Sequence, residues 1–262
     1  IPARQYEDTL SYVDRYYCIN DKVKKIAEKT LLKENSKLKI KAVGWPRFDI
    51  MKGQFNCIFQ SQILKFKKKY KNFILFNSDF GLVSKHDIEI FDTTKVFRSK
   101  DIKFVKKNNL IKKDIRNHVI KDFLKFKIFL SNIVSKIGNT KIVIRPHPAE
   151  SLTEWKKIVK KSKKIFLEEP TYDATSIILA ATHVIHRGCT TGYQSLVSGK
   201  KTGYLDLINE NRKPYYFRPS LFNLSKKIKN ENNFLQWLRN NRSSNSKIIN
   251  TKLNKILNIK NK

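Results

Sequence analysis

Two short apolar segments of this sequence each end in residues that can bind an anion. Residues 141–144 run into Arg-Pro-His-Pro at 145–148, and residues 183–185 run into His-Arg-Gly-Cys-Thr-Thr at 186–191. Buried parallel strands that end in polar residues form the ligand crevice of an open α/β sheet. We therefore predict that the two segments are neighbouring strands and that both ends face one crevice suited to nucleotide phosphate.

The side chains at these ends differ in what they can do. His147 lies between two prolines, which stiffen its loop, so the imidazole can donate to a phosphate or transfer a proton at the sheet rim. Arg145 lies on the same strand face two residues earlier and suits phosphate through its forked donors. His186 is expected in the same crevice, although a structural histidine is the alternative. Three further histidines are interpreted as structural: His86, His118 and His183.

The second segment leads into a predicted helix at residues 190–198. Gly188 allows close approach of a ligand, and the first backbone N–H groups of a helix lack intrahelical partners. Thr190 and Thr191 add donors, and the helix dipole is positive at this end. The competing interpretation is that Thr190 only caps the helix.

Two acids follow other predicted strands or their loops. Asp79 comes after the apolar run at 73–76, and Glu150 comes two residues after the Arg-Pro-His-Pro segment. Either carboxylate could act as a general base, although an acid in a loop is more often solvated. Both are kept as catalytic candidates together with His147.

The elements that must position these residues alternate along the chain. Strands are predicted at 72–77, 141–145, 164–168, 183–187 and 202–205, with helices at 111–137, 151–161, 173–181 and 190–198 between them. The longest helix shows apolar residues at a period of 3.6, and Gly138 supplies its end. Strands alternating with helices indicate parallel pairing and a doubly wound α/β sheet.

The remaining segments suggest a domain organisation. Residues 1–50 contain a β-α-β pattern and are interpreted as the end of an upstream domain, so we expect further sequence before Ile1. Residues 51–70 predict a linker helix, and residues 71–220 predict the ligand-binding domain. Residues 221–262 are interpreted as a helical polar tail.

The composition restricts the partners. The 262 residues carry 55 Lys and Arg against 22 Asp and Glu, a net charge of +33. This charge favours nucleic acid, an anionic membrane surface or an anionic substrate. However, the lysines are spread along the chain, which fits a composition bias equally well. The three cysteines have neither metal-ligand spacing nor a disulfide pattern, so a reducing, cytoplasmic compartment is expected.

Several segments, in this order, resemble the bacterial surface carbohydrate biosynthesis proteins. These proteins are GT-B-like and are similar to capsule Kdo transferases and CDP-glycerol glycerophosphotransferases. The matching segments are 44–49, 73–81, 144–148 with Glu150 and Trp155, and 185–191 continuing to Gly199-Lys200. The resemblance covers most of the chain, and the ordered set is more specific than any one motif.

The resemblance implies two Rossmann-like domains with the active site between them. The C-terminal domain would bind a nucleotide-sugar, and the upstream domain would bind a glycan or lipid-linked glycan acceptor. His147, Thr190 and Thr191 would contact the donor phosphate, and Arg47 and Asp49 are expected at the domain interface. Relatives often carry Glu where this sequence has Gln194, which can still bond to a ribose hydroxyl but without charge assistance.

We therefore expect a glycosyltransferase of surface-polysaccharide assembly in the cytoplasm, peripheral to the inner face of the cytoplasmic membrane. No metal or other cofactor is required, because positive groups can stabilise the departing nucleotide phosphate. The alternatives are a polyol-phosphate transferase or a sugar-nucleotide epimerase on the same fold. A basic module that binds nucleic acid or anionic membrane is the alternative from another class, with nucleic acid the less favoured.

Overall fold

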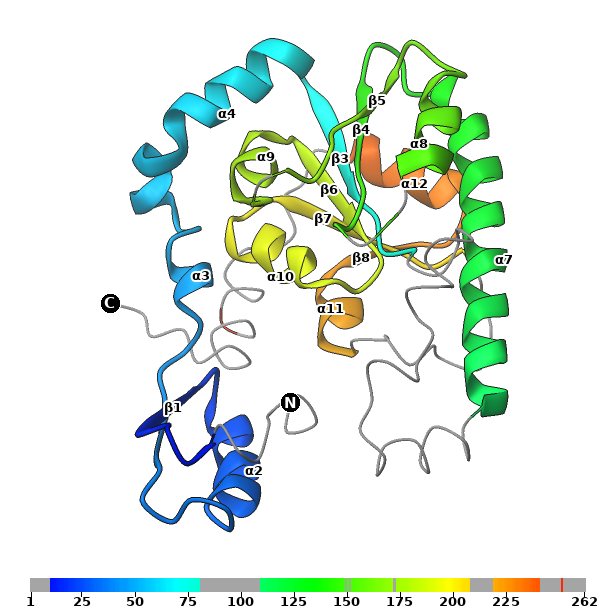
Figure 1. Cartoon of the computed structure of the whole chain (residues 1–262). Helices are drawn as coiled ribbons and strands as arrows, with labels where there is room; N and C mark the ends of the chain where they lie inside the picture. The colour runs from blue at the N-terminus through cyan, green and yellow to red at the C-terminus, as the bar shows by residue number, and fades with distance from the viewer. Residues whose placement is uncertain are drawn as a thin grey trace. The chain divides into compact units, whose positions relative to one another are not determined.

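A computed structural model describes residues 10–80, 109–148, 150, 152–171, 173–207, 219–240 and 251. The chain divides into two compact units, with the boundary between residues 54 and 55 (Figure 1). Within these described ranges, no helix is both long and apolar enough to cross a membrane.

The smaller unit is a β-α-β arrangement, as predicted. Strands β1 (Arg15–Cys18) and β2 (Lys39–Ala42) pair in parallel, and helix α2 (Asp21–Leu31) connects them. The α2 N-cap is Asn20, whose side chain accepts the Val23 N–H at 2.9 Å. Helix α3 (Pro46–Asp49) follows β2. The small core consists of Leu10, Cys18, Ala27, Leu31 and Leu38.

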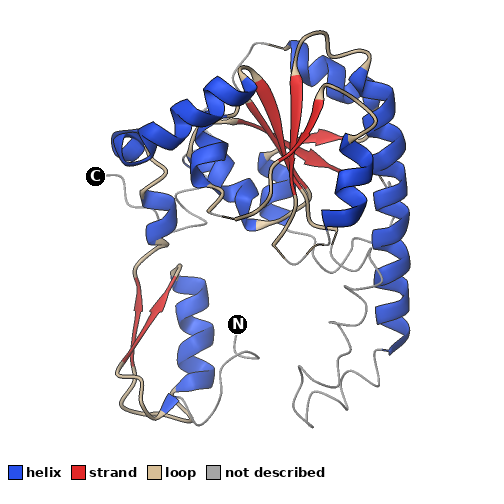
Figure 2. Cartoon of the chain, turned by 45° about the horizontal axis from the view of Figure 1, so that its top comes forward, coloured by secondary structure: helices blue, strands red, loops and turns tan. Residues whose placement is uncertain are grey.

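The larger unit is built on a six-stranded parallel sheet (Figures 1 and 2). The strands are β3 (Phe73–Asn77), β4 (Lys141–Arg145), β5 (Ile165–Leu167), β6 (His183–His186), β7 (Lys201–Leu205) and β8 (Lys226–Ile228). Their order in the sheet is β5-β4-β3-β6-β7-β8. The chain thus extends from β3 to one side and then crosses to the other, which is the strand order of a Rossmann-type sheet. The predicted doubly wound α/β fold is confirmed.

Helices cover both faces of this sheet (Figure 1). One layer consists of α7 (Asn109–Val134), α8 (Leu152–Val159) and α12 (Glu231–Arg239). The other consists of α4 (Asn56–Tyr70), α9 (Thr175–Ala180), α10 (Thr190–Val197) and α11 (Pro219–Leu224). Because strand side chains alternate between faces, Phe76 joins the core under α7 while Asn77 points to the α10 face.

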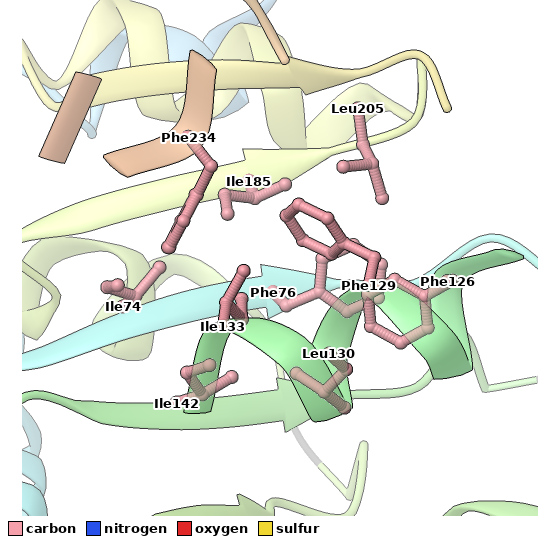
Figure 3. A pocket seen from close by; sticks show the side chains of 10 residues that line it. All are labelled: Ile74, Phe76, Phe126, Phe129, Leu130, Ile133, Ile142, Ile185, Leu205 and Phe234. Atoms are coloured by element: carbon pink, nitrogen blue, oxygen red, sulfur yellow. The ribbon is translucent and has the colours of Figure 1, made fainter. Parts of the chain in front are cut away.

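The core under α7 is rich in aromatic side chains. Phe76 and Phe126 stack with ring centroids 4.3 Å apart and an interplanar angle of 15°. Figure 3 shows a small pocket here, of about 10 Å³, lined only by Ile, Leu and Phe side chains. A pocket of this size holds at most one water, and its apolar lining offers that water no hydrogen bond. It is therefore a packing feature of the core.

Two segments differ from the sequence prediction. The linker helix begins at Asn56, because a 3-10 turn (Gly53–Phe55) precedes α4. The expected polar tail instead supplies β8 and α12, and Phe234 and Trp237 of α12 are buried against the sheet. The prediction failed there because β8 is a three-residue edge strand with two lysines, and polar edge strands resemble loops in sequence.

Candidate functional site

The loops after β3, β4 and β6 meet at the carboxyl edge of the sheet. Strand order reverses between β3 and β6, and ligands of open α/β sheets bind outside the carboxyl ends at such a point. His147 and Thr190 lie at this same edge. Their strands are not neighbours, however, because β3 lies between β4 and β6. Two strand spacings separate the tips by roughly 10 Å.

Helix α10 begins without a side-chain cap. Its N-cap is Cys189, not Thr190, and no capping hydrogen bond forms, so the interpretation of Thr190 as a mere cap is wrong. The Cys189 sulfur interacts with Thr191 Oγ1 at 2.8 Å and lies beside the N–H groups of Thr191 and Gly192. The Gly192 N–H already donates to the Cys189 carbonyl at 3.0 Å, whereas the Thr191 N–H faces only the sulfur, a weak acceptor, and stays available to an anion.

The charge state of Cys189 also favours anion binding at the start of α10. Although part of the residue reaches solvent, desolvation of the sulfur raises the pKa of Cys189 to about 11, with the charge of Asp79 as a further cause. The thiol therefore stays neutral at physiological pH and brings no negative charge to the helix start. Gly188, at φ 116°, makes the turn before it, a backbone conformation that side chains with a Cβ rarely adopt.

The prediction that His186 contacts a ligand is wrong. Its side chain is 0% exposed, and Gly192 packs so closely that a Cβ there would lie 2.6 Å from the imidazole. Nδ1 accepts the Gly188 N–H at 3.1 Å, so the ring proton is on Nε2, which faces Ser225 Oγ at 3.0 Å. Burial lowers the pKa of His186 to about 3. The neutral ring shapes the turn at Gly188 and cannot serve as a cation.

Ser78 joins the loop after β3 to the loop that carries His147. The Ser78 N–H donates to the Arg145 carbonyl at 3.1 Å, and Ser78 Oγ accepts the His147 N–H at 3.3 Å. The His147 side chain is exposed at the rim, whereas Arg145 is 8% exposed and lies opposite Asn77 in the sheet. His147 is therefore an exposed residue on a backbone that is held in place.

The structure contradicts a catalytic-base role for Glu150. Both of its oxygens are occupied: Oε1 accepts the Phe80 N–H at 2.6 Å, and Oε2 accepts from Ser78 Oγ at 2.6 Å and Trp155 Nε1 at 2.8 Å. Burial raises the pKa of Glu150 to about 7 against the opposing effect of these donors. A buried carboxylate that accepts from three internal donors fixes the loop and does not face a substrate.

The side chain of Arg187 also forms its hydrogen bonds within the protein. Its Nε donates to Asp122 Oδ2 at 2.9 Å, and its two terminal nitrogens donate to the same carboxylate and to the Asp79 carbonyl. The guanidinium lies 3.8 Å from the centre of the Phe80 ring. Because the side chain is 1% exposed, Arg187 supports the crevice from within.

Some buried polar atoms near this edge have no partner among the described residues. They include both amide atoms of Asn77, Nε2 of Gln194 and Oδ1 of Asp122. Buried polar atoms are normally hydrogen-bonded, so an ordered water is the partner expected for these atoms. Asp79 is half-buried, and its charge contributes to the raised pKa values of Glu150 and Cys189, after burial. Its carboxylate therefore lies near both adjacent loops.

The other predicted residues lie elsewhere or lack a described side chain. Arg47 and Asp49 are in α3 of the smaller unit, where Asp49 pairs with Lys52 at 3.0 Å. His183 is structural as predicted: its ring packs against Trp237, and burial lowers its pKa to about 4. His86 lies outside the described residues, as does the side chain of His118. In the described part of the chain, no cluster of three or more His, Cys, Asp or Glu could hold a metal ion.

The sequence analysis placed Ser78 and Arg187 in segments at this edge without assigning them a role, and it did not identify Asp122. For Asp122 the sequence contains a signal, which is its position on the helix. Asp122 falls four residues before Phe126 and seven before Phe129, on the face of the helix that packs on the core. An acid at such a position requires a buried partner. For Ser78 no comparable signal exists, because its bond to Glu150 joins residues 72 positions apart.

These features define a Rossmann-type α/β domain with a GT-B-like fold. The solved structure of the wall teichoic acid polymerase TagF is similar, with a TM-score of 0.54 and 13% identity over 95% of this chain and 54% of that one. A TagF variant soaked with CDPG gives a TM-score of 0.52 and 10% identity over 95% and 51%. The UDP-GlcNAc 2-epimerase of Methanocaldococcus jannaschii gives 0.48 and 15% over 84% and 55%.

The chain spans about half the length of these solved structures. No protein-family model matches the sequence, and no curated protein matches it. At this level of identity the likeness concerns the fold, and the chemistry has to be argued from the residues at the sheet edge.

Proposed function

We propose that this chain is the donor-binding part of a glycosyltransferase of bacterial surface-polysaccharide assembly. The observation that carries the proposal is the start of α10, which follows a positive-φ glycine at the switch point and has no side-chain cap. Uncapped N–H groups and the positive end of the helix dipole form an anion site. A nucleotide diphosphate is the ligand class that Rossmann-type sheets bind at this place.

In this proposal the Gly188–Thr191 turn holds the phosphate of a nucleotide-sugar, and exposed His147 donates to it from the other side of β3. These donors stabilise the negative charge that develops on the departing nucleotide, so the transfer needs no metal. Gln194 Nε2 has no partner among the described residues and would bond to a ribose hydroxyl, which requires ligand binding to expose this buried side chain. Asp79, half-buried between the loops, is the candidate base that remains after Glu150.

The acceptor class follows from the fold likeness and the charge of the chain. TagF is described as a wall teichoic acid polymerase, which supports a role in surface-polymer assembly and keeps a polyol-phosphate transferase as the first alternative. A sugar-nucleotide epimerase is the second. The net charge of +33 supports a lipid-linked acceptor at the inner face of the cytoplasmic membrane, because basic surfaces attract anionic leaflets.

Calorimetric titration with UDP, CDP and their sugar or glycerol derivatives tests the proposal. We expect saturable binding that His147→Ala weakens about tenfold, which corresponds to about 1.4 kcal/mol. The control Lys160→Ala, which removes an exposed residue after α8, should bind like the unaltered chain. Equal affinity of the His147→Ala variant would remove the phosphate role of His147. Tight, steeply salt-dependent binding to DNA with no nucleotide binding would favour the basic-module alternative.

The Cys189→Asp variant should change stability and binding in opposite directions. Asp is a strong N-cap and complements the helix dipole, so the larger unit should gain about 1 kcal/mol of stability. The same carboxylate would occupy the N–H groups and repel phosphate, so nucleotide affinity should fall at least tenfold. Thermal unfolding and calorimetry measure the two effects. The control Cys189→Ala removes the sulfur without adding charge and should bind nearly normally; a Cys189→Asp variant that binds equally well would place the phosphate elsewhere.

A further inference from the structure

The three residues after β3 are held from both sides. From the β4 side, Glu150 accepts hydrogen bonds from Ser78 and Phe80. From the β6 side, Arg187 donates to the Asp79 carbonyl and covers the Phe80 ring. The segment Ser78–Phe80 therefore connects the loop that carries His147 to the turn that begins α10.

Arg187 is placed to couple these two halves. Its backbone precedes Gly188 in the turn, while its guanidinium reaches Asp122 on α7 and the Asp79 carbonyl. The side chain is 1% exposed and its donors are used internally, so it does not reach a ligand. A displacement of the guanidinium would move the turn relative to Ser78–Phe80.

The stability of the fold does not explain such a pair. Two charges lose their hydration on burial, and replacing a buried ion pair with apolar residues of similar volume is often neutral or stabilising. Apolar side chains could therefore fill the space between β6 and α7 equally well. What they could not supply is the directed bond to the Asp79 carbonyl, which fixes the position of the loop after β3.

We propose that the Asp122–Arg187 pair is a positioning element that sets the spacing between Ser78–Phe80 and the Gly188–Thr191 turn. At this spacing one diphosphate fits between His147 and the start of α10. This inference rests on the proposed function, because it concerns the same crevice. Asp122 and Arg187 act through the residues they hold and not by contact with the ligand. The pair therefore controls ligand affinity separately from the stability of the fold.

The test is the double variant Asp122→Leu/Arg187→Met, which removes both charges at similar volume. We expect it to unfold at or above the temperature of the unaltered chain and to bind UDP or CDP at least tenfold more weakly. The matched control is Lys136→Met/Glu231→Leu, which removes a partly exposed ion pair, 2.7 Å long, between the turn after α7 and the start of α12. That control should keep full nucleotide affinity.

Amide hydrogen exchange gives a readout that does not need a ligand. In the Asp122→Leu/Arg187→Met variant the N–H groups of Ser78, Phe80 and Gly192 should exchange faster, while those of Val143 and Val184 in the strands should not change. Unaltered exchange at Ser78 and Phe80, or unaltered nucleotide affinity, would overturn the inference.

Two further outcomes are also decisive. If the unaltered chain binds no nucleotide, the proposed function fails, and the exchange rates alone decide whether the pair positions the loop. If the double variant does not fold, Asp122→Glu takes its place, because it keeps the charge but shifts the guanidinium. We then expect at least fivefold weaker binding by a folded protein, and normal binding by Asp122→Glu would contradict the inference.

Discussion

The Asp122→Ala variant is expected to lose about 3–5 kcal/mol of unfolding free energy, because the guanidinium of Arg187 would stay buried without its counter-charge. Asp122 is 6% exposed and accepts from two nitrogens of Arg187. Asp122 is the carboxylate that forms an ion pair with the Arg187 guanidinium. The remaining bond to the Asp79 carbonyl satisfies one donor but does not neutralise the charge.

Urea unfolding followed by circular dichroism measures this loss. The control is Glu231→Ala, which removes one partner of an exposed contact between α12 and Lys136 in the turn after α7. Exposed ion pairs contribute little, so the control should unfold close to the unaltered chain. A loss for Asp122→Ala no larger than that of the control would show that Arg187 is not buried as described.

The stability of the larger unit should depend on pH through Glu150. Burial raises the pKa of Glu150 from 4.5 to about 7, so the folded unit binds this proton more tightly than the unfolded chain does. The contribution is complete below about pH 4.5 and is lost as the pH rises through about 7. A rise of this size corresponds to about 3 kcal/mol. In the protonated form the carboxyl can donate to Ser78 Oγ and still accept from Phe80 and Trp155.

The Glu150→Gln variant isolates this effect, because an amide does not titrate. Unfolding free energies measured between pH 5 and pH 8 should fall with pH in the unaltered chain and change less in the variant. The variant should also be less stable at pH 5, since its NH₂ group faces donors. The control is Glu154→Gln, which removes a partner of the Lys157 surface pair and should keep the original pH dependence. Identical pH profiles for Glu150→Gln and the unaltered chain would contradict the assignment.

The fold could largely be predicted from the sequence, since its signals are local. The runs 73–77, 141–145 and 183–186 are apolar and β-branched or aromatic, and each forms a buried parallel strand. The alternation with helices sufficed for a doubly wound sheet. The order of the strands could not be predicted in the same way, because sequence periodicity carries no information on which strands pair. The segments that form β4 and β6 were predicted to be neighbours, but β3 lies between them.

The site was predicted less well, because its chemistry depends on contacts between distant residues. His186 and His147 both follow apolar runs, but His186 is still the last residue of its strand and is covered by α10 at Gly192. His147 lies two residues beyond its strand and is exposed. Glu150 looked like a free loop acid, since nothing local shows that Ser78 and Phe80 donate to it. Arg187 likewise pairs with Asp122, which is 65 positions away in the sequence.

The most direct test of the central claim is a titration of UDP or CDP into isotopically labelled protein, followed by the backbone amide resonances. We expect saturable shifts at Gly188, Thr191 and Gly192 and at His147, with the buried strand amides of β3 nearly unchanged. Saturable nucleotide binding that leaves the amides at the start of α10 unshifted would contradict it.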